Sequence, residues 1–336
     1  MVKYETIPEC LPYHPNSELI GRPGYYPNVS ADQLKAVNAF IEQIEAEELQ
    51  FNTDEEHEFL KLLRFLRARK FNVEQSMKMV REDVKWRLAE NRLNLRRETA
   101  EEVLGCDLTQ IYNFFPTWIQ GVDKQLRPVS YRKFGKFEIW NVLKLTSMER
   151  LVRFHAWETE QALRGMYKGS QESGYNIETF VLVIDAAGWG LRLATSDAYA
   201  FIKNMATTDS DHYPERLGNM LIINAPTVLS VAWKVVQGFL DPVTKKKVRI
   251  LAKRSEWEPM LKQYIDVSQI PQQYGGEAPD PTPEDAISQM NPPPEGKDAE
   301  ISVEMIAAMK LEDDGGAACH ETESKDEDDA AINTNA

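Results

Sequence analysis

Two basic clusters are the groups in this 336-residue chain best suited to hold an anion. Each has four cations within a short stretch, namely Arg64, Arg67, Arg69 and Lys70, and Lys245, Lys246, Lys247 and Arg249. The first lies at the end of a predicted helix, where cations also complement the negative end of the helix dipole. The second follows a strongly apolar segment, and basic groups beside an apolar surface are typical of a peripheral site for anionic lipid headgroups.

Catalytic motifs are weak or missing. The segment 185–190 (Asp-Ala-Ala-Gly-Trp-Gly) follows a predicted strand as a dinucleotide loop would, but Leu193 stands where the third glycine is required. The sequence has no nucleophile elbow, no Walker-type loop and no H-E-x-x-H motif. The five histidines are dispersed along the chain, at His14, His57, His155, His212 and His320. We therefore expect neither an enzyme nor a metal or cofactor site.

The net charge of −14 is concentrated at the C-terminus. Residues 278–336 hold 16 Asp and Glu against 3 Lys, which leaves residues 1–277 close to neutral. A nucleic-acid site needs a broad basic field, so we expect no nucleic-acid partner. The acidic, Pro-rich stretch cannot build a core and is predicted to be a disordered tail. It could recruit a protein partner, and Ile301, Met305 and Met309 could form one short helix within it.

No stretch resembles a membrane span or a secretory signal. The apolar runs fall short of the ~18 residues that a span requires, and no basic region followed by an apolar stretch opens the chain. Cys10, Cys106 and Cys319 are scattered and odd in number, which disfavours a disulfide framework or a structural zinc site. These features are typical of a cytoplasmic protein, which we expect to be a monomer.

Helix signals dominate the N-terminal part of the chain. Residues 1–29 are rich in Pro, Tyr and Asn and are predicted to form an extended arm. Caps at Ser30, Thr53 and Asn72 then predict three helices. Together these helices form a helical N-terminal lobe over residues 30–95.

Strands and helices alternate in the next part, which we assign to a second domain over residues 96–277. Apolar strands are predicted at 128–131, 180–184 and 220–223, with helices between them from the cap at 146–147 to about 168 and over 196–205. The continuous apolar run at 180–184 indicates a sheet that is covered on both faces. This alternation predicts an α/β fold with a mainly parallel sheet.

The segment 225–247 has more apolar surface than a surface helix needs. Its helix is predicted to end at Asp241-Pro242, and the apolar arc covers roughly 200°, against little more than ~100° for an ordinary core-facing helix. Such a helix either lies between core layers, or it lines an apolar cavity on one side and meets a membrane on the other. The arc contains Val228, Val231, Ala232, Val235, Val236 and Phe239, and is widened by Leu229, Trp233 and Leu240.

Five motifs place the chain close to a known family. They are the segments 63–71, 127–129, 213–218, 222–226 and 239–242, which read LRFLRARKF, RPV, YPERLG, IINAP and FLDP. Their order and spacing over about residues 30–277 strongly resemble the yeast-type phosphatidylinositol transfer proteins of the CRAL-TRIO family. The resemblance implies a helical N-terminal lobe beside an α/β lobe that encloses one lipid in a hydrophobic cavity, closed by a mobile gate helix.

The resemblance also implies which residues bind the lipid. Cations and a hydroxyl can take the phosphate of the headgroup, and a carboxylate can accept hydrogen bonds from inositol hydroxyls. The implied headgroup residues are Arg69, Lys70, Glu215, Thr244 and Lys247, with Arg216 nearby. The implied gate helix, which would also contact the membrane, contains Val228, Leu229, Ala232, Trp233, Val236, Phe239 and Leu240. The expected ligand is therefore phosphatidylinositol, transferred between membranes or presented at their surface for phosphoinositide signalling.

One departure from the family pattern bears on selectivity. Phe180 and Leu182 stand where family members that also bind phosphatidylcholine carry small hydroxyl residues. We therefore expect the cavity to exclude phosphatidylcholine and to take a different second ligand, such as a sterol or another apolar molecule. A lipid-binding scaffold without net transfer is the alternative function. At the level of the family, the transient membrane would be that of the Golgi or of endosomes.

Overall fold

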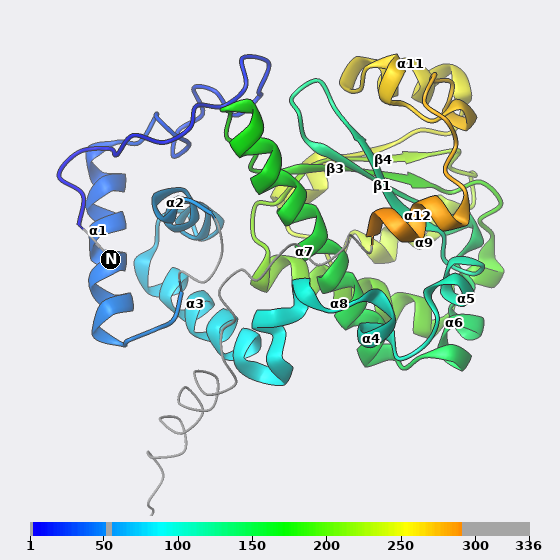
Figure 1. The fold of residues 1–336 in the computed structure, drawn as a ribbon, viewed down its shortest axis with the longest axis horizontal. Helices are drawn as coiled ribbons and strands as arrows, with labels where there is room; N and C mark the ends of the chain where they lie inside the picture. The colour runs from blue at the N-terminus through cyan, green and yellow to red at the C-terminus, as the bar shows by residue number, and fades with distance from the viewer. Residues whose placement is uncertain (1–2, 52–55, 291–336) are drawn as a thin grey trace, which may run out of the picture. The chain divides into compact units, whose positions relative to one another are not determined.

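The helical N-terminal lobe consists of three α-helices and a 3₁₀ segment within the part of the chain that the computed structural model describes, residues 3–51 and 56–290 (Figure 1). These elements are α1 (Ala31–Ala46), α2 (Glu58–Ala68), α3 (Val73–Leu88) and η1 (Ala89–Arg97). Ser30 and Gln33 form the predicted capping box of α1, and the Asn72 side chain caps α3. Both predicted helix starts are confirmed.

Helix α2 begins later than the sequence suggested. Its N-cap is His57, whose Nδ1 accepts a hydrogen bond from the backbone N–H of Phe59 at 3.3 Å. The predicted cap at Thr53 lies outside the described residues. The helix itself is unusually buried, because Phe59, Leu62 and Leu66 are fully covered by α1 and α3. Their burial fixes the direction in which the end of α2 points.

The N-terminal arm runs across both lobes. Its described residues, 3–29, contain turns and an isolated bridge but no helix or strand. The backbone N–H of Asn176, beyond the end of the longest helix, donates to the carbonyl of Pro12 at 2.7 Å, and the Tyr13 hydroxyl donates to Glu178 at 2.5 Å. In Figure 1 the arm passes in dark blue from α1 towards α7 (Met148–Ser173). The arm therefore ties the two lobes together.

The second lobe is built on a five-stranded sheet within the described residues, in the order β1-β2-β3-β4-β5. The strands are β1 (Thr117–Val122), β2 (Pro128–Arg132), β3 (Phe180–Asp185), β4 (Leu217–Ile223) and β5 (Val248–Ile250). β1 and β2 are antiparallel, and every other neighbouring pair is parallel. The predicted α/β fold with a mainly parallel sheet is therefore confirmed.

Alternation along the strands divides the sheet residues between two environments, because successive side chains point to opposite faces. On one face Val181, Val183 and Leu221 join Trp257 and Leu261 of α11 (Arg254–Tyr264). In Figure 1 α11 lies above the sheet and α8 (Ser196–His212) lies below it, while α7 runs obliquely from below the sheet up past its left-hand side. The strand residues that alternate with Val181, Val183 and Leu221 face the side on which α8 lies. This second face forms one wall of the site described below.

Further helices cover the lower part of the second lobe. They include α4 (Ala100–Leu104), α5 (Leu108–Tyr112), α6 (Ile139–Leu145) and the short η2 (Phe134–Lys136) and η3 (Leu191–Leu193). Ser147 caps α7, as predicted, but α7 ends at Gly174 in the left-handed conformation, beyond the expected end near residue 168. None of the helices in the described ranges is both long and apolar enough to cross a membrane.

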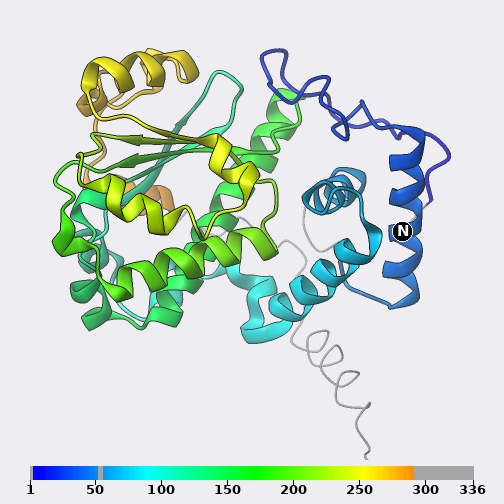
Figure 2. The ribbon, with the colours of Figure 1, turned by 180° about the vertical axis from the view of Figure 1, so that it is seen from behind.

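The apolar helix predicted to end at Asp241-Pro242 is shorter in the structure. α9 (Leu229–Val236) is followed by a turn, and a second helix, α10 (Pro242–Lys247), begins where the first was expected to end. Gly238 lowers helix propensity, and Asp241 caps the next helix by accepting from the N–H groups of Val243 and Thr244. From behind, the yellow-green to yellow segment that carries α9 and α10 lies beside α8 (Figure 2). The predicted helix is therefore broken before its expected end.

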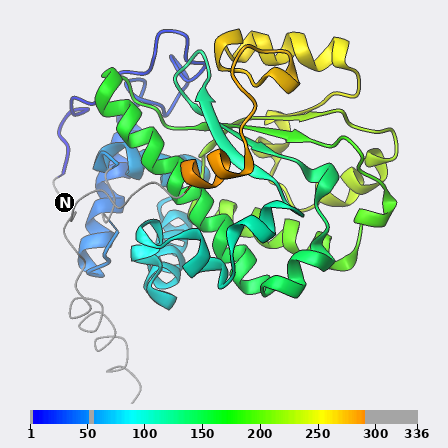
Figure 3. The ribbon, with the colours of Figure 1, turned by 45° about the vertical axis from the view of Figure 1, so that its right-hand side comes forward.

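The predicted disordered tail is wrong for its first part. α12 (Pro283–Met290) lies against β1 and α5, where Ala286 is fully buried and Ile287 contacts the core (Figure 3). Thr282 and Asp285 cap it reciprocally, each accepting a hydrogen bond from the other's backbone N–H. The acidic average of the tail obscured this local helix signal. The helix predicted around 301–309 lies outside the described residues.

Candidate functional site

An apolar cavity of about 640 Å³ lies between the sheet and the helices α8 and α9. That size is within the range of about 300–1,000 Å³ that is usual for ligand sites. Its floor is the second face of the sheet, which includes Phe180, Leu182, Ile184, Met220 and Ile222. The two residues predicted to govern selectivity, Phe180 and Leu182, are thus part of the cavity wall. Neither side chain offers a hydrogen bond to a ligand.

The short helix α9 and the turn after it form a second wall. Val228 is the one predicted gate residue that does not line the cavity. The other six do, namely Leu229, Ala232, Trp233, Val236, Phe239 and Leu240. The opposite side of α9 carries Val231 and Val235, which are 57% and 44% exposed. The prediction that Leu229, Trp233 and Leu240 contact a membrane does not fit this orientation. The outward apolar surface belongs to two other residues of the predicted apolar arc, which were not among the expected gate and membrane residues.

Polar residues from three separate segments line the same cavity. Arg69 and Lys70 follow α2, Glu215 precedes β4, and Thr244 and Lys247 lie on α10. The Nζ of Lys247 lies 3.9 Å from Oε2 of Glu215 and donates to the Leu217 carbonyl at 2.6 Å. The Thr244 hydroxyl donates to the Asp241 carboxylate. Cations, a hydroxyl and a carboxylate thus stand together beside apolar walls, which suits a phosphorylated polyol attached to a lipid.

Two of these residues have left-handed backbone conformations that side chains with a Cβ rarely adopt. The φ angle is 53° at Lys70 and 62° at Glu215. A left-handed residue of this kind costs about 1–2 kcal/mol, and such conformations gather at binding sites, where the surrounding structure maintains them. Lys70 follows the C-cap of α2, a usual place for this conformation. Glu215 lies two residues beyond Tyr213, the C-cap of α8, and its carboxylate lies 3.9 Å from Nζ of Lys247.

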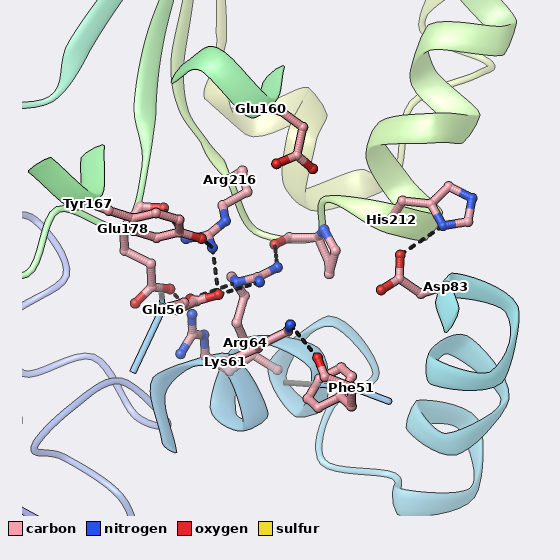
Figure 4. A network of polar contacts seen from close by, with 12 residues as sticks. Phe51, Glu56, Lys61, Arg64, Asp83, Glu160, Tyr167, Glu178, His212 and Arg216 are labelled. Carbon is pink, nitrogen blue, oxygen red and sulfur yellow. Dashed lines mark hydrogen bonds and ion pairs between the residues drawn. The ribbon is translucent and has the colours of Figure 1, made fainter. Parts of the chain in front are cut away.

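Arg216 borders the cavity near the headgroup residues, as expected, but its guanidinium is held by protein groups. Its residue is only 2% exposed, and its guanidinium is directed into a buried network (Figure 4). Nη2 donates to Glu56 at 2.6 Å and to the Tyr167 hydroxyl at 2.9 Å, and Nη1 donates to the Glu178 carbonyl at 3.2 Å. The physical reason is charge neutralisation, because a buried guanidinium requires a carboxylate partner. Arg216 therefore connects the lobes.

The first basic cluster divides into structural and cavity residues. Nε and Nη2 of Arg64 donate to Glu56 at 3.1 and 2.6 Å, and Nη1 donates to the Pro214 carbonyl at 3.0 Å (Figure 4). Glu56 is thereby shared between Arg64 and Arg216. Because both arginines are buried, these contacts fix the segment that carries Glu215 against α2. Arg67, Arg69 and Lys70 line the cavity, and of these Arg69 and Lys70 are the ones that keep the predicted anion-binding role.

Arg67 is the second structural cation of this cluster. It pairs with Glu178 and lies over the ring of Tyr25, with 3.9 Å between the guanidinium carbon and the ring centroid. Burial, the largest single effect, would lower the pKa of Arg67, but Glu178, Tyr13, Tyr25 and Glu215 together outweigh burial and hold that pKa above its ordinary value. The Arg67–Glu178 pair thus stays charged and fixes the end of α2 against the start of β3.

Tyr25 belongs to the site but escaped the sequence analysis. Its hydroxyl donates to Oε2 of Glu215 at 3.0 Å, the oxygen that faces Lys247. Burial raises the pKa of Tyr25 to about 12, against the effect of Arg67 and with a contribution from Glu215. The phenol therefore remains a hydrogen-bond donor at neutral pH. Tyr25 and Glu215 are 190 residues apart, so no local sequence pattern predicts their contact. The abundance of Tyr in the N-terminal arm was the one indication that this segment could take part in the site.

No group of three or more His, Cys, Asp or Glu residues in the described part of the chain is arranged to hold a metal ion. Cys10 and Cys106 are both free thiols. Burial raises the pKa of Cys10 to about 12, so this thiol is not activated as a nucleophile. The chemistry available at the cavity is therefore recognition of a ligand by hydrogen bonds, charge and apolar contact.

Comparisons with known proteins agree with the motifs. The family model described as the CRAL/TRIO domain matches residues 113–276, and the CRAL/TRIO N-terminal domain matches residues 32–82. The Sec14 cytosolic factor of Schizosaccharomyces pombe is 30% identical over 274 residues, which are 81% of this chain and 91% of that protein. The resemblance found in the sequence is confirmed.

Other relatives are longer than this chain. The phosphatidylinositol/phosphatidylcholine transfer protein SFH12 of Arabidopsis thaliana is 31% identical over 249 residues, which are 73% of this chain but 44% of that protein. Among solved structures, Sfh5 matches with a TM-score of 0.59 at 16% identity, covering 84% of this chain and 96% of the solved one. That match shows the shared fold.

Proposed function

Because the chain belongs to the CRAL-TRIO family, whose members are lipid-binding proteins and not enzymes, we propose that it binds phosphatidylinositol and exchanges it with membranes. The observation that carries the proposal is the Lys247–Glu215 pair, 3.9 Å apart, in the wall of an apolar cavity that Thr244, Arg69 and Lys70 also line. The cations and the hydroxyl would bind the phosphate, and Glu215 would accept hydrogen bonds from inositol hydroxyls.

The energetics of this function are those of exchanging a lipid between two apolar media, not those of dissolving the lipid in water. A diacyl lipid leaves one apolar medium for another, so the net change in free energy is small, while its passage through water presents a large barrier. An apolar cavity at the membrane surface lowers that barrier by shielding the acyl chains. Movement of α9 and the turn at Gly238 would open the cavity, because that segment is one wall and is joined to α10 by only a few residues.

The outward side of this segment supports docking on an anionic membrane. Val231 and Val235 are exposed apolar residues, and Lys245 and Arg249 are exposed cations on the same stretch of chain, all outside the cavity wall. Apolar side chains can insert at the headgroup level while the cations meet anionic lipids. The protein would thus be cytoplasmic and bind membranes transiently, in keeping with relatives that are named cytosolic factors.

Selectivity follows from the cavity floor. Relatives such as SFH12 are named for both phosphatidylinositol and phosphatidylcholine. Phe180 and Leu182 cannot hydrogen-bond a second phosphate, and burying a phosphate without partners is costly. We therefore propose that phosphatidylcholine is not a ligand of this chain.

Transfer of labelled phosphatidylinositol between vesicles tests the proposal. Lys247→Ala removes a charge-assisted contact of about 1.5–3 kcal/mol, so transfer should fall about tenfold or more while the melting temperature stays close to that of the wild type. Lys245→Ala is the matched control, because it removes an equal charge from the same helix at an exposed position outside the cavity wall, and so should slow transfer only through weaker docking, by about 1 kcal/mol. Equal transfer by the two variants would refute the headgroup assignment. Tight binding without transfer would favour the scaffold alternative.

A further inference from the structure

A second, much smaller pocket lies beside the apolar cavity, between α7 and the first three strands of the sheet. Its volume is about 20 Å³, and Ile119, Ser130 and residues 157–162 of α7 are part of its lining. Arg132 and Phe180 border both this small pocket and the cavity, so the two spaces share a wall. A water molecule needs about 10–15 Å³ of such volume, so the small pocket has room for one water and for no larger ligand.

Three side chains that line the small pocket each bury a polar atom that has no hydrogen-bond partner among the described residues. These atoms are Nε of Arg132, Oε2 of Glu158 and Oε1 of Gln161. The three residues are 7%, 7% and 8% exposed, so bulk solvent does not reach the three atoms. Leaving such atoms unpaired is costly, and folded proteins pair them with other protein groups or with ordered water.

The other polar atoms of these side chains are held by the protein. Oε1 of Glu158 accepts from the Thr117 hydroxyl at 2.6 Å, and Nη2 of Arg132 lies 3.2 Å from Oε2 of Glu158 as an ion pair. Nε2 of Gln161 donates to the Arg96 carbonyl at 3.1 Å, which leaves its Oε1 as the atom that faces away from this bond. Turning any of the three side chains to pair with another would break one of these contacts.

The distances are short enough for one water to bridge these atoms. Two nitrogens on one guanidinium carbon are about 2.3 Å apart, because each C–N bond is about 1.33 Å long. Since Nη2 of Arg132 lies 3.2 Å from Oε2 of Glu158, Nε is at most about 5.5 Å from that oxygen. A water with hydrogen bonds of about 2.9 Å spans up to about 5.8 Å. Gln161 follows Glu158 by three residues on α7, a spacing that places side chains next to each other.

The donors and acceptors match water and no other small group. Nε–H of Arg132 can only donate, whereas the oxygens of Glu158 and Gln161 accept, so a bridging molecule must accept one hydrogen bond and donate two. An ammonium ion cannot accept, and the guanidinium would repel a metal cation. We propose that the small pocket is a binding site for one structural water molecule, which accepts from Arg132 and donates to Glu158 and Gln161. This inference concerns no lipid and stands whether or not the chain binds phosphatidylinositol.

The water gives Gln161 a role at the cavity, although Gln161 is not part of the cavity wall. Through the water, Gln161 holds the guanidinium of Arg132, which is part of that wall. Gln161 is therefore a positioning residue that acts from behind the wall. The wall at Arg132 and Phe180 can then meet an apolar ligand with the buried Nε of Arg132 already paired.

A crystal structure of the full-length chain at a resolution better than about 2 Å tests the proposal. We expect one ordered water within about 2.6–3.2 Å of the three atoms. Gln161→Leu should lose this water, because it removes one acceptor while keeping a side chain of similar volume. Gln161→Glu is the matched control and should keep the water, since both variants lose the amide that donates to Arg96 but only this one retains a side-chain oxygen. In solution, a nuclear Overhauser effect between water and Nε–H of Arg132 should appear in the wild type and be lost in Gln161→Leu.

Three results would overturn the proposal. The first is a crystal structure with no density between the three atoms, or with side chains that pair directly with one another. The second is a density peak closer than about 2.5 Å to both oxygens, because a metal cation approaches oxygen ligands more closely than water does. The third is a water that persists unchanged in Gln161→Leu, or that is lost in Gln161→Glu as well.

Discussion

Substitution of Val231 by glutamate tests whether the outer side of α9 meets the membrane. The residue is 57% exposed, so about half of its apolar surface remains to be buried in a lipid surface. Complete burial of a valine contributes about 1.5–3 kcal/mol, so the lost insertion amounts to roughly 1 kcal/mol. The new carboxylate adds about 1 kcal/mol of repulsion from an anionic leaflet. Together they predict about 30-fold weaker vesicle binding.

Ser230→Glu separates these two effects. Ser230 is exposed on the same helix and carries no apolar surface, so this variant adds the charge alone. We expect it to weaken binding only about fivefold. Co-sedimentation with vesicles containing anionic lipid measures both variants, and thermal melting measures their folding. The reasoning is refuted if both weaken binding equally, or if Val231→Glu lowers the melting temperature substantially.

Three further predictions address other parts of the account. Wild-type protein should transfer phosphatidylcholine far more slowly than phosphatidylinositol, because Phe180 and Leu182 offer no hydrogen bond; equal rates in a vesicle assay would contradict this. Tyr25→Phe should weaken phosphatidylinositol binding about fivefold without changing the melting temperature, since it removes about 1 kcal/mol of support for Glu215; unchanged affinity by titration would exclude that role. Glu56→Gln should cost about 3–5 kcal/mol of unfolding free energy, because two buried arginines lose their shared carboxylate; a loss below about 1 kcal/mol in urea unfolding would refute it.

The central strands were predictable from the sequence because their signals are local and strong. β3 and β4 are continuous apolar runs, and their alternation determines which side chains face the cavity. β1 and β5 were missed because one contains glycine and mixed polarity and the other has three residues. α12 was missed because average composition was applied to the whole tail, although Ala286 and Ile287 are apolar neighbours within it.

The site residues that belong to family motifs were predictable from the sequence, whereas contacts between segments far apart in the chain were not. Motif resemblance named Lys247 and Glu215, which lie close together in the structure. It also named Arg216, whose charge is neutralised by Glu56 from the other lobe, a contact across 160 residues that no spacing reveals. The inward side of α9 could not be distinguished from its outward side, because valines occur on both and only the position of the cavity separates them.

The identity of the lipid that the cavity binds tests the central claim most directly. Purified full-length protein is incubated with vesicles that contain equal amounts of phosphatidylinositol and phosphatidylcholine, re-isolated, and its bound lipid is extracted and identified by mass spectrometry. The account predicts phosphatidylinositol as the bound phospholipid, and its loss in Lys247→Ala but not in Lys245→Ala. Phosphatidylcholine bound to the same extent, or no phospholipid bound at all, would contradict it.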